Sequence, residues 1–210
     1  MSGDLRIDRV VTSGVFELDG GTWEVDNNVW VVGDDDQVVV IDGAHDPKPV
    51  IEAVGDRTVV AVVCTHGHND HVNFAPELAE ELFAPLLLHP GDDPLWRMTH
   101  PDQSYWSLTD EQRISLAGTE IQIIHAPGHS PGSVCLYLPE ADALFSGDTL
   151  FSGGPGATGR SYSDFPTIIG SLRDRLLTLP EHTSVYTGHG DATTIGAEAP
   201  HLSEWIARGF

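Results

Sequence analysis

The sequence predicts one α/β domain in which two β-sheets pack face to face and helices cover their outer sides. Short apolar runs that are typical of strands alternate with helix-like segments along the chain. A length of 210 residues suits a single domain with a sizeable core. A hydrophobic content of 40%, with 22 glycines and 14 prolines, is typical of a globular protein with many turns. We therefore expect residues 1–210 to form one domain.

The amino-terminal part predicts a meander of strands separated by Gly, Asp and Asn. The strand-like runs are VTSGVFEL, TWEVDNNVWVVG, DDQVVVIDG and RTVVAVVCT, and GDDD at 33–36 predicts a hairpin turn. The segment PKPVIEAVG predicts a short helix, because Pro47 or Pro49 can open a helix and Gly55 can close it.

The rest of the chain predicts three more helices and several strands. Pro76 is expected to open the helix PELAEELF, and the strand PLLLHP follows before an irregular stretch over 91–113. The runs TEIQIIHAPG, SVCLYLP and DALFSGD predict strands. From Pro166, apolar residues at spacings of three and four predict a helix, followed by a strand, SVYTG, and a last short helix from Pro200. The glycine-rich loop at 153–159 lacks the Gly-Lys-Ser/Thr ending of a phosphate-binding loop.

Charge and composition exclude several classes of protein. The formal net charge is −22, which argues against a nucleic-acid partner or an anionic membrane surface. The chain has no 18-residue apolar run, and MSGDLRIDRVV does not resemble a signal peptide, so we expect neither a membrane span nor export. Cys64 and Cys135 lie in apolar runs, where a reduced thiol behaves as a small hydrophobe. These features favour a cytoplasmic location.

The segment THGHNDHV, residues 65–72, brings three imidazoles and a carboxylate into one loop. It follows the buried strand VVAVVCT and therefore emerges at the carboxyl end of a sheet, where sites in α/β proteins usually lie. A single histidine at a strand end is usually a polar surface residue. A desolvated cluster needs a compensating partner, so this loop predicts metal binding. The candidate ligands are His66, His68, Asp70 and His71.

Three further candidate ligands follow later strands, and glycine flanks each of them. His129 lies in PGHSPGS, Asp148 in SGDTLF and His189 in TGHGD. Glycine lets the backbone turn sharply, so each loop can bring its side chain to a common point. Each motif alone is weak evidence, but together, in this order, they predict one site.

This series of motifs resembles the metallo-β-lactamase superfamily, and within it the glyoxalase II-like thioester hydrolases. The resemblance extends from NNVWVV and VVVIDGA to TGHGDATTIGAE near the end of the chain. It implies a four-layer αβ/βα sandwich with a dinuclear metal site between the sheets. It also implies that one metal is held by His66, His68 and His129, the other by Asp70, His71 and His189, and that Asp148 bridges them.

The resemblance also bears on neighbouring residues and on the metal. Asp42 matches an acidic residue that supports the ligand loop, so we expect it to hold the loop rather than to ligate. β-Lactamases of the best-known class have cysteine at the position of Asp148, so the resemblance does not favour a drug-inactivating enzyme. Imidazoles and carboxylates suit Zn²⁺, and a mixed nitrogen and oxygen site also accepts Fe or Mn. We expect two zinc ions, with iron or manganese as alternatives.

These expectations predict a hydrolytic mechanism. Two cations roughly 3.5–4 Å apart lower the pKa of a shared water towards about 7, so hydroxide exists at neutral pH. We expect this hydroxide to attack the carbonyl carbon of a small-molecule acyl-thiol, from which a thiolate departs. Asp70 is the expected catalytic residue, because a ligand beside the bridging position can orient the hydroxide or carry its proton.

Other reactions and substrates remain open. A mononuclear iron persulfide dioxygenase would use only His66, His129 and Asp148, and a lactone hydrolase would use the same hydroxide. A binding module with a relic site is disfavoured because all seven ligand positions are filled. Lys48 is the sole lysine and 21 residues follow His189, so we do not expect the glutathione-binding mode of full-length glyoxalase II. Mycothiol, bacillithiol, or an S-formyl or S-acyl adduct formed in aldehyde detoxification are candidate substrates.

Several other residues have two interpretations each. Arg160 can meet a substrate carboxylate or pair with Asp164 in its own loop, and the ion pair is favoured. Trp96, Tyr105 and Trp106 can line a pocket or cap the core. The remaining histidines match no ligand position and are expected at the surface or in hydrogen bonds; they are His45, His89, His100, His125, His182 and His201.

Overall fold

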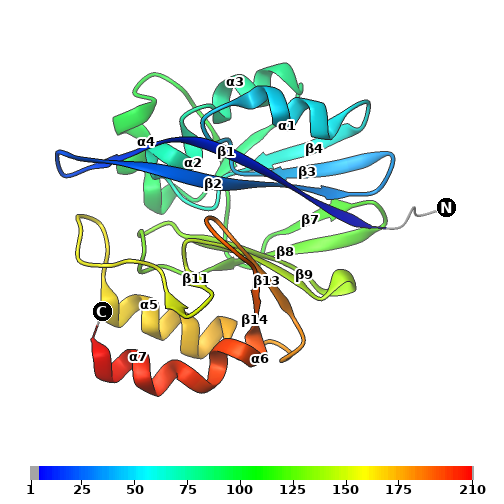
Figure 1. Ribbon diagram of the computed structural model, residues 1–210. Coiled ribbons are helices and arrows are strands. Elements are labelled where there is room, and N and C mark those ends of the chain that lie inside the picture. The colour runs from blue at the N-terminus through cyan, green and yellow to red at the C-terminus, as the bar shows by residue number, and fades with distance from the viewer. Residues whose placement is uncertain (1–4, 210) are drawn as a thin grey trace.

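Two mixed β-sheets pack against each other between two layers of helices (Figure 1). The computed structural model describes residues 5–209. In spatial order, the amino-terminal sheet contains β1 (Arg6–Leu18), β2 (Gly21–Gly33), β3 (Gln37–Ile41), β4 (Thr58–Val63), β5 (Leu86–Leu88) and β6 (Trp106–Ser107). The carboxy-terminal sheet contains β14 (Thr193–Thr194), β13 (Ser184–Thr187), β10 (Ala143–Gly147), β9 (Val134–Leu138), β8 (Thr119–His125) and β7 (Arg113–Leu116). A separate two-stranded ribbon consists of β11 (Leu150–Phe151) and β12 (Gly154–Pro155).

The helices divide between the two sheets (Figure 1). Those beside the amino-terminal sheet are α1 (Pro47–Val54), α2 (Asn69–Val72), α3 (Ala75–Glu81) and α4 (Asp93–Thr99). Those beside the carboxy-terminal sheet are α5 (Phe165–Ser171), α6 (Ile195–Glu198) and α7 (Leu202–Arg208). The π-helical turn Leu172–Leu176 continues α5, and short 3₁₀ turns lie at Pro90–Asp92, Pro139–Ala141 and Ala199–His201. This is the αβ/βα sandwich that the sequence predicts.

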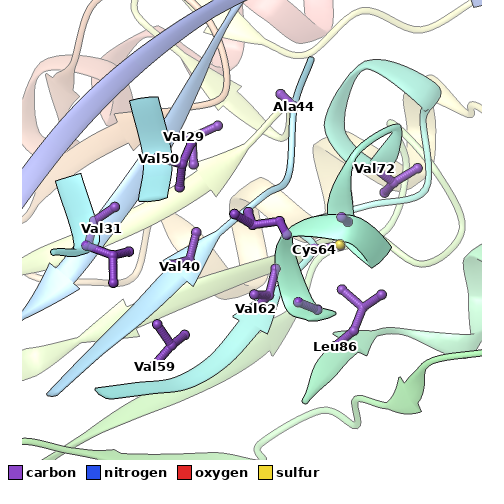
Figure 2. Close-up of a cluster of buried hydrophobic side chains, with 14 of the residues drawn as sticks. Val29, Val31, Val40, Ala44, Val50, Val59, Val62, Cys64, Val72 and Leu86 are labelled. Atoms are coloured by element: carbon purple, nitrogen blue, oxygen red, sulfur yellow. The ribbon is translucent and has the colours of Figure 1, made fainter. Parts of the chain in front are cut away.

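Three apolar cores separate the four layers. In β3, Val38 and Val40 face the helices α1 and α3, and Figure 2 shows this core around Val40 and Val62. Val39 and Ile41 point the other way, into the core between the sheets. Because both faces of this strand are buried, its sequence is a continuous apolar run rather than an alternating one. A third core joins the carboxy-terminal sheet to α5 and α7.

The long hairpin formed by β1 and β2 is closed by a tight turn. Leu18 pairs with Gly21, which leaves Asp19 and Gly20 as the two turn residues, with φ of 54° and 76°. Positive φ at both positions is the geometry of a type I′ turn, which matches the twist of the flanking strands. In this register Phe16 and Trp23 lie opposite each other close to the tip of the hairpin.

Most predicted elements are present, and two predictions need correction. β4 pairs parallel with β3, so the meander predicted up to this strand is wrong at its last member: α1 carries the chain across, which a parallel pair requires. The predicted irregular stretch 91–113 contains α4 and β6, and β7 begins at Arg113. In α4 only Leu95 and Trp96 are buried, too few to produce a recognisable apolar period.

Pro47 begins α1 and Gly55 ends it with φ of 61°, as the sequence predicts, and Asp46 caps the helix by accepting a hydrogen bond from the Lys48 N–H. Cys64 and Cys135 are free and buried. Within residues 5–209, no helix is both long enough and apolar enough to cross a bilayer.

The core between the sheets predicts one large mutational effect. Phe145 is fully buried there and stacks on Tyr186 with ring centroids 5.2 Å apart. We expect Phe145→Ala to lower the free energy of unfolding by about 3–5 kcal/mol, measured by urea denaturation. The matched control is Phe83→Ala, because Phe83 is 95% exposed and its removal should change stability by about 0.5 kcal/mol or less. Equal effects in the two variants would contradict the packing described.

Candidate metal centre

All seven side chains predicted as ligands meet where strands of both sheets end. The ends of β4, β8, β10 and β13 supply them: His66 and His68 follow β4, Asp70 and His71 lie in α2, and His129, Asp148 and His189 follow the other three strands. The two sheets are joined at this point by a hydrogen bond of 2.8 Å from the Val134 N–H to the Thr65 carbonyl. The ligand loop is therefore fixed against the carboxy-terminal sheet.

One group consists of three imidazoles whose nitrogens converge. His68 Nδ1 lies 3.0 Å from His66 Nε2 and 3.0 Å from His129 Nε2. The Nδ1 atoms of His66 and His129 point away from the group and form hydrogen bonds. His66 Nδ1 contacts Thr65 Oγ1 at 3.1 Å, and His129 Nδ1 contacts the Ala157 carbonyl at 2.9 Å. A carbonyl can only accept, so His129 carries its proton on Nδ1 and presents the lone pair of Nε2 to the group.

The same argument applies to His66. Thr65 Oγ1 donates to Asp42 Oδ2 at 3.0 Å, so it accepts from His66 Nδ1, and His66 Nε2 also presents a lone pair. His68 Nδ1 has at most one proton for these two neighbours. One pair of nitrogens 3.0 Å apart therefore opposes lone pair to lone pair unless a cation lies between them.

A second group combines two imidazoles with a carboxylate. His71 Nε2 and His189 Nε2 are 3.2 Å apart, and Asp70 Oδ2 lies 3.6 Å and 3.3 Å from them. Their Nδ1 atoms are also held from behind, by Asp42 Oδ2 at 2.8 Å and by the Asp26 carbonyl at 2.7 Å. Both rings therefore direct Nε2 at the carboxylate.

Asp148 lies between the two groups. Its Oδ1 is 3.3 Å from His71 Nε2, and its Oδ2 is 3.6 Å from His129 Nε2 and 3.4 Å from His189 Nε2. Each of its oxygens therefore lies near the second group, and Oδ2 also reaches the first. This is the position that a bridging carboxylate requires.

The two groups differ in charge. Burial, reinforced by the neighbouring histidines, lowers the pKa of His66 far below its usual value, and burial together with His129 lowers the pKa of His68 to about 3. Neutral imidazoles of this kind are the form that binds metals. In the second group, burial opposes protonation, but the carboxylates of Asp148 and Asp70 outweigh it and raise the pKa of His71 and that of His189, the latter to about 10.

The carboxylates respond in the opposite direction. Burial would raise the pKa of Asp70, but His71, His189 and Asn27 outweigh it and lower that pKa to about 2. The pKa of Asp148 falls far below its usual value because His71 and His189 outweigh burial in the same way. Both carboxylates are therefore ionised at neutral pH, and protons on two histidines supply the balancing positive charge.

The donor set fits divalent metal ions. The candidate ligand atoms of His66, His68 and His129 lie within 4.8 Å of one another, and so do those of Asp70, His71 and His189. Among residues 5–209, His68 Nε2 and Asp70 Oδ1 are buried without a hydrogen-bond partner. Three or four nitrogen and oxygen donors around one point are typical of zinc and of other first-row metals.

Asp42 supports the loop of the candidate ligands, as the resemblance implies. Its Oδ1 accepts from the Thr65 N–H at 2.7 Å, and its Oδ2 accepts from Thr65 Oγ1 and from His71 Nδ1. A carboxylate that fixes both the backbone and one imidazole of the loop orients the loop without entering the site.

Asp92 is a second support, which sequence reasoning missed. It is fully buried and accepts from the Gly67 N–H at 2.7 Å, from Ser130 Oγ at 2.7 Å and from the Gly132 N–H at 2.6 Å. It therefore joins the loop of His66 and His68 to the loop of His129. Its motif, HPGD, carried no signal, because the partners lie 25 to 40 positions away in the sequence.

The Asn-Asn pair of β2 is a third support. Asn27 Nδ2 donates to Asp70 Oδ2 at 3.1 Å. Asn28 Nδ2 lies 3.0 Å from the carbonyls of Thr187 and Gly190, which flank His189. Adjacent residues of one strand thus fix two candidate ligands that come from opposite sheets.

Two aromatic rings, Phe16 and Trp23, and the Arg160 guanidinium lie beside the first group. Phe16 packs on His68 with ring centroids 5.2 Å apart, and the Arg160 guanidinium lies 3.8 Å from the ring centroid of Trp23. The favoured ion pair between Arg160 and Asp164 is wrong: Asp164 caps α5 by accepting from the Thr167 N–H and hydroxyl. A carboxylate placed before a helix is used by the backbone donors nearest to it.

The predicted aromatic candidates lie elsewhere. Trp96 is fully buried in the core beneath α1 and α3, and Tyr105 packs against the same core. Trp106 is 71% exposed on the edge strand β6. These residues cap the core or lie at the surface, so the alternative that they line the site is wrong.

The other histidines stay outside the cluster of ligands. His45, His89, His100, His125, His182 and His201 each form a hydrogen bond, as the sequence predicts. Of these, His45 reaches a candidate ligand through the Asn27 side chain, and His100 bonds the carbonyl of Val72, next to His71.

Comparisons with known proteins agree with this geometry. A model of the metallo-beta-lactamase superfamily matches residues 22–189. An uncharacterised 11.5 kDa protein from the thcD 3′ region of Rhodococcus erythropolis is 43% identical over 160 residues, 76% of this chain and 91% of that protein. The probable metallo-hydrolase YqgX of Bacillus subtilis is 30% identical and covers 78% and 85% of the two chains. The hydroxyacylglutathione hydrolase GloC of Haemophilus influenzae is 29% identical and covers 79% and 85%.

Two solved structures are similar over most of the chain. The crystal structure of TTHA1623 in a di-iron-bound form has 34% sequence identity and a TM-score of 0.75, and covers 83% of this chain and 93% of that one. The BLEG-1 B3 metallo-beta-lactamase has 28% identity and a TM-score of 0.76, and covers 92% and 99%.

Removal of Asp92 tests whether it joins the two ligand loops. Asp92→Ala leaves three donors without their acceptor, so we expect a loss of at least about 2 kcal/mol in the free energy of unfolding of the metal-free protein. The measurement is urea denaturation, with Asp174→Asn as control: Asp174 is exposed and paired with Arg173, and its loss should cost less than about 1 kcal/mol. A fully stable Asp92→Ala protein would contradict this role.

Proposed function

We propose that this chain, which belongs to the metallo-β-lactamase superfamily, is a dinuclear metal-dependent hydrolase that acts on thioesters of a small thiol. The observation that carries the proposal is the pair of donor groups with Asp148 between them. His66, His68 and His129 would hold one ion, Asp70, His71 and His189 the other, and Asp148 would bridge them.

Zinc is the proposed metal, because neutral imidazoles and carboxylates suit it well. The di-iron form of TTHA1623 keeps iron as an alternative, and manganese is compatible with the same donors. When bound, such ions lower the pKa of a coordinated water and polarise a carbonyl oxygen.

The residues of the chain have separate tasks in this proposal. The outward hydrogen bonds of His66, His129, His71 and His189 fix which ring nitrogen is offered to a metal. Asp70 is the proposed catalytic residue. Its buried Oδ1, which no hydrogen bond from residues 5–209 occupies, can accept a proton from the attacking water.

A substrate with a negatively charged group is proposed on the basis of Arg160. Its guanidinium rests on Trp23, beside the Phe16 ring that packs on His68. No carboxylate lies within ion-pair distance of it in the part of the chain that the structure describes, although its charge also acts on Asp19 in the hairpin turn, which bonds the Ser161 N–H. An acyl-thiol with a carboxylate would supply that partner, which is consistent with the name of the relative GloC.

We also propose a cytoplasmic protein that binds neither nucleic acid nor membranes. Two buried free thiols are consistent with a reducing compartment. The net charge of −22 disfavours anionic partners.

Metal analysis and a substrate screen on one preparation test the function. We expect two metal ions per chain and hydrolysis of at least one acyl-thiol in a panel that includes glutathione, mycothiol and bacillithiol esters, a lactone and a cephalosporin. His189→Ala should retain one ion and lose more activity than the roughly 10–100-fold that loss of an outer hydrogen-bond partner costs. About one iron per chain with sulfur-dependent oxygen uptake would instead indicate a persulfide dioxygenase. Equal, very slow turnover of every acyl-thiol would count against thioester hydrolysis.

Arg160 gives a separate prediction about substrate binding. Arg160→Ala should raise KM for a carboxylate-bearing acyl-thiol by roughly 10-fold or more, since a charge-assisted hydrogen bond contributes about 1.5–3 kcal/mol, and should leave kcat nearly unchanged. Arg113→Ala is the control, because Arg113 is paired with Glu120. If KM for the charged substrate and for an uncharged analogue rises equally, Arg160 does not bind the carboxylate.

A further inference from the structure

His45 is a buried imidazole outside the seven candidate ligands, held in an unfavourable backbone conformation. Its φ is 55°, in the left-handed region, and its side chain is buried, with the residue 8% exposed. A residue with a side chain pays a conformational cost there, and such a cost persists only where the surrounding contacts require it. At Gly14, a Cβ atom would lie 2.1 Å from His45 Nδ1. The neighbouring strand therefore leaves room for this ring.

The polarity of the hydrogen bonds around His45 follows from one backbone donor. The His45 N–H donates to Asn73 Oδ1 at 2.8 Å, which identifies the other end of that amide as Nδ2. Asn73 Nδ2 lies 3.1 Å from His45 Nδ1 and can only donate to it. Nδ1 is therefore the acceptor, and the proton of the neutral ring is on Nε2. Burial lowers the pKa of His45 and favours this neutral form.

The proton on His45 Nε2 also determines how the Asn27 amide is oriented beside Asp70. His45 Nε2–H lies 2.9 Å from Asn27 Oδ1 and donates to it. The Asn27 amide is thereby oriented with Nδ2 towards Asp70 Oδ2, at 3.1 Å. Without His45, the two ends of the Asn27 amide could exchange, and an amide oxygen facing a carboxylate would repel it. The backbone N–H of His45 thus sets the donor and acceptor roles along a chain of hydrogen bonds that ends at the candidate ligand Asp70.

The oxygen that receives this hydrogen bond is the one that faces the second donor group. Asp70 Oδ2 lies 3.3 Å from His189 Nε2 and 3.6 Å from His71 Nε2. A carboxylate oxygen has two lone pairs, so the Asn27 amide can occupy one and leave the other for a cation. Fixing this oxygen fixes the rotation of the whole carboxylate.

We propose that His45 is a positioning residue that orients the Asp70 carboxylate through Asn27 and so sets the metal affinity of the second donor group without touching a metal. The proposal rests on the proposed function, because it needs that group to hold an ion. The proposal explains both the strained backbone of His45 and the absence of a side chain at Gly14, because both are needed to place the His45 ring against Asn27.

Stepwise Zn²⁺ titration against a chromophoric chelator tests the proposal, with wild type, His45→Gly, Asn27→Ala and the double variant. Glycine adopts a φ of 55° without strain, so His45→Gly removes the imidazole while keeping the backbone. We expect the second equivalent of Zn²⁺ to bind about 10–100-fold more weakly in His45→Gly, and the first equivalent to bind as in wild type. Because His45 acts through Asn27, the double variant should match Asn27→Ala alone.

His100→Gln is the matched control. The His100 ring bonds the Val72 carbonyl at the end of α2, the helix that carries Asp70, but does not contact Asp70 itself. The substitution should leave both affinities unchanged. Unchanged affinity for the second ion in His45→Gly overturns the proposal, as does equal weakening of both ions or additive loss in the double variant. If wild type binds fewer than two Zn²⁺ ions, the proposed function fails first. Thermal unfolding of each metal-free variant identifies any that does not fold, and the uncharged Asn27→Ser variant then replaces Asn27→Ala.

Discussion

Between the two sheets, His68 Nδ1 lies 3.0 Å from His66 Nε2 and 3.0 Å from His129 Nε2. The other ring nitrogens of His66 and His129 are hydrogen-bonded, which leaves a lone pair on each Nε2 facing His68. Neutral rings repel one another in this arrangement, and a single proton on His68 can relieve only one contact. A cation relieves all of them at once. In the metal-free protein, protons on His71 and His189 balance the ionised Asp70 and Asp148 of the second group, and a metal ion bound there would replace those protons.

Packing in the apolar cores stabilises the fold enough to keep these mutually repelling side chains together. Apolar cores on both sides of each sheet fix the strand ends from which the ligands project. Buried acceptors then join the loops to one another: Asp42 holds the ligand loop, and Asp92 joins it to the loop of His129. Preorganisation of this kind keeps the donors in place before a metal arrives, so little rearrangement is needed on binding.

The sequence predicted the sandwich and the convergence of the ligands because both depend on local signals. Buried strands are unbroken apolar runs, and each ligand follows a strand beside a glycine. The supports were not predictable in this way. Asp92, Asn27 and His45 act on residues 18 to 43 positions away. Asn27 lies in the NNVWVV segment that carries the resemblance, but no local pattern indicates which residue any of the three contacts. Arg160 was assigned the wrong partner, because the helix that follows Asp164 competes for the same carboxylate.

The central claim is that the two donor groups hold two metal ions that share Asp148. Crystals grown with zinc and measured on both sides of the zinc absorption edge test it most directly. We expect two anomalous peaks, one among His66, His68 and His129 and one among Asp70, His71 and His189, each within bonding distance of Asp148. A map with no peak there, or with a single peak at full zinc saturation, would contradict the account.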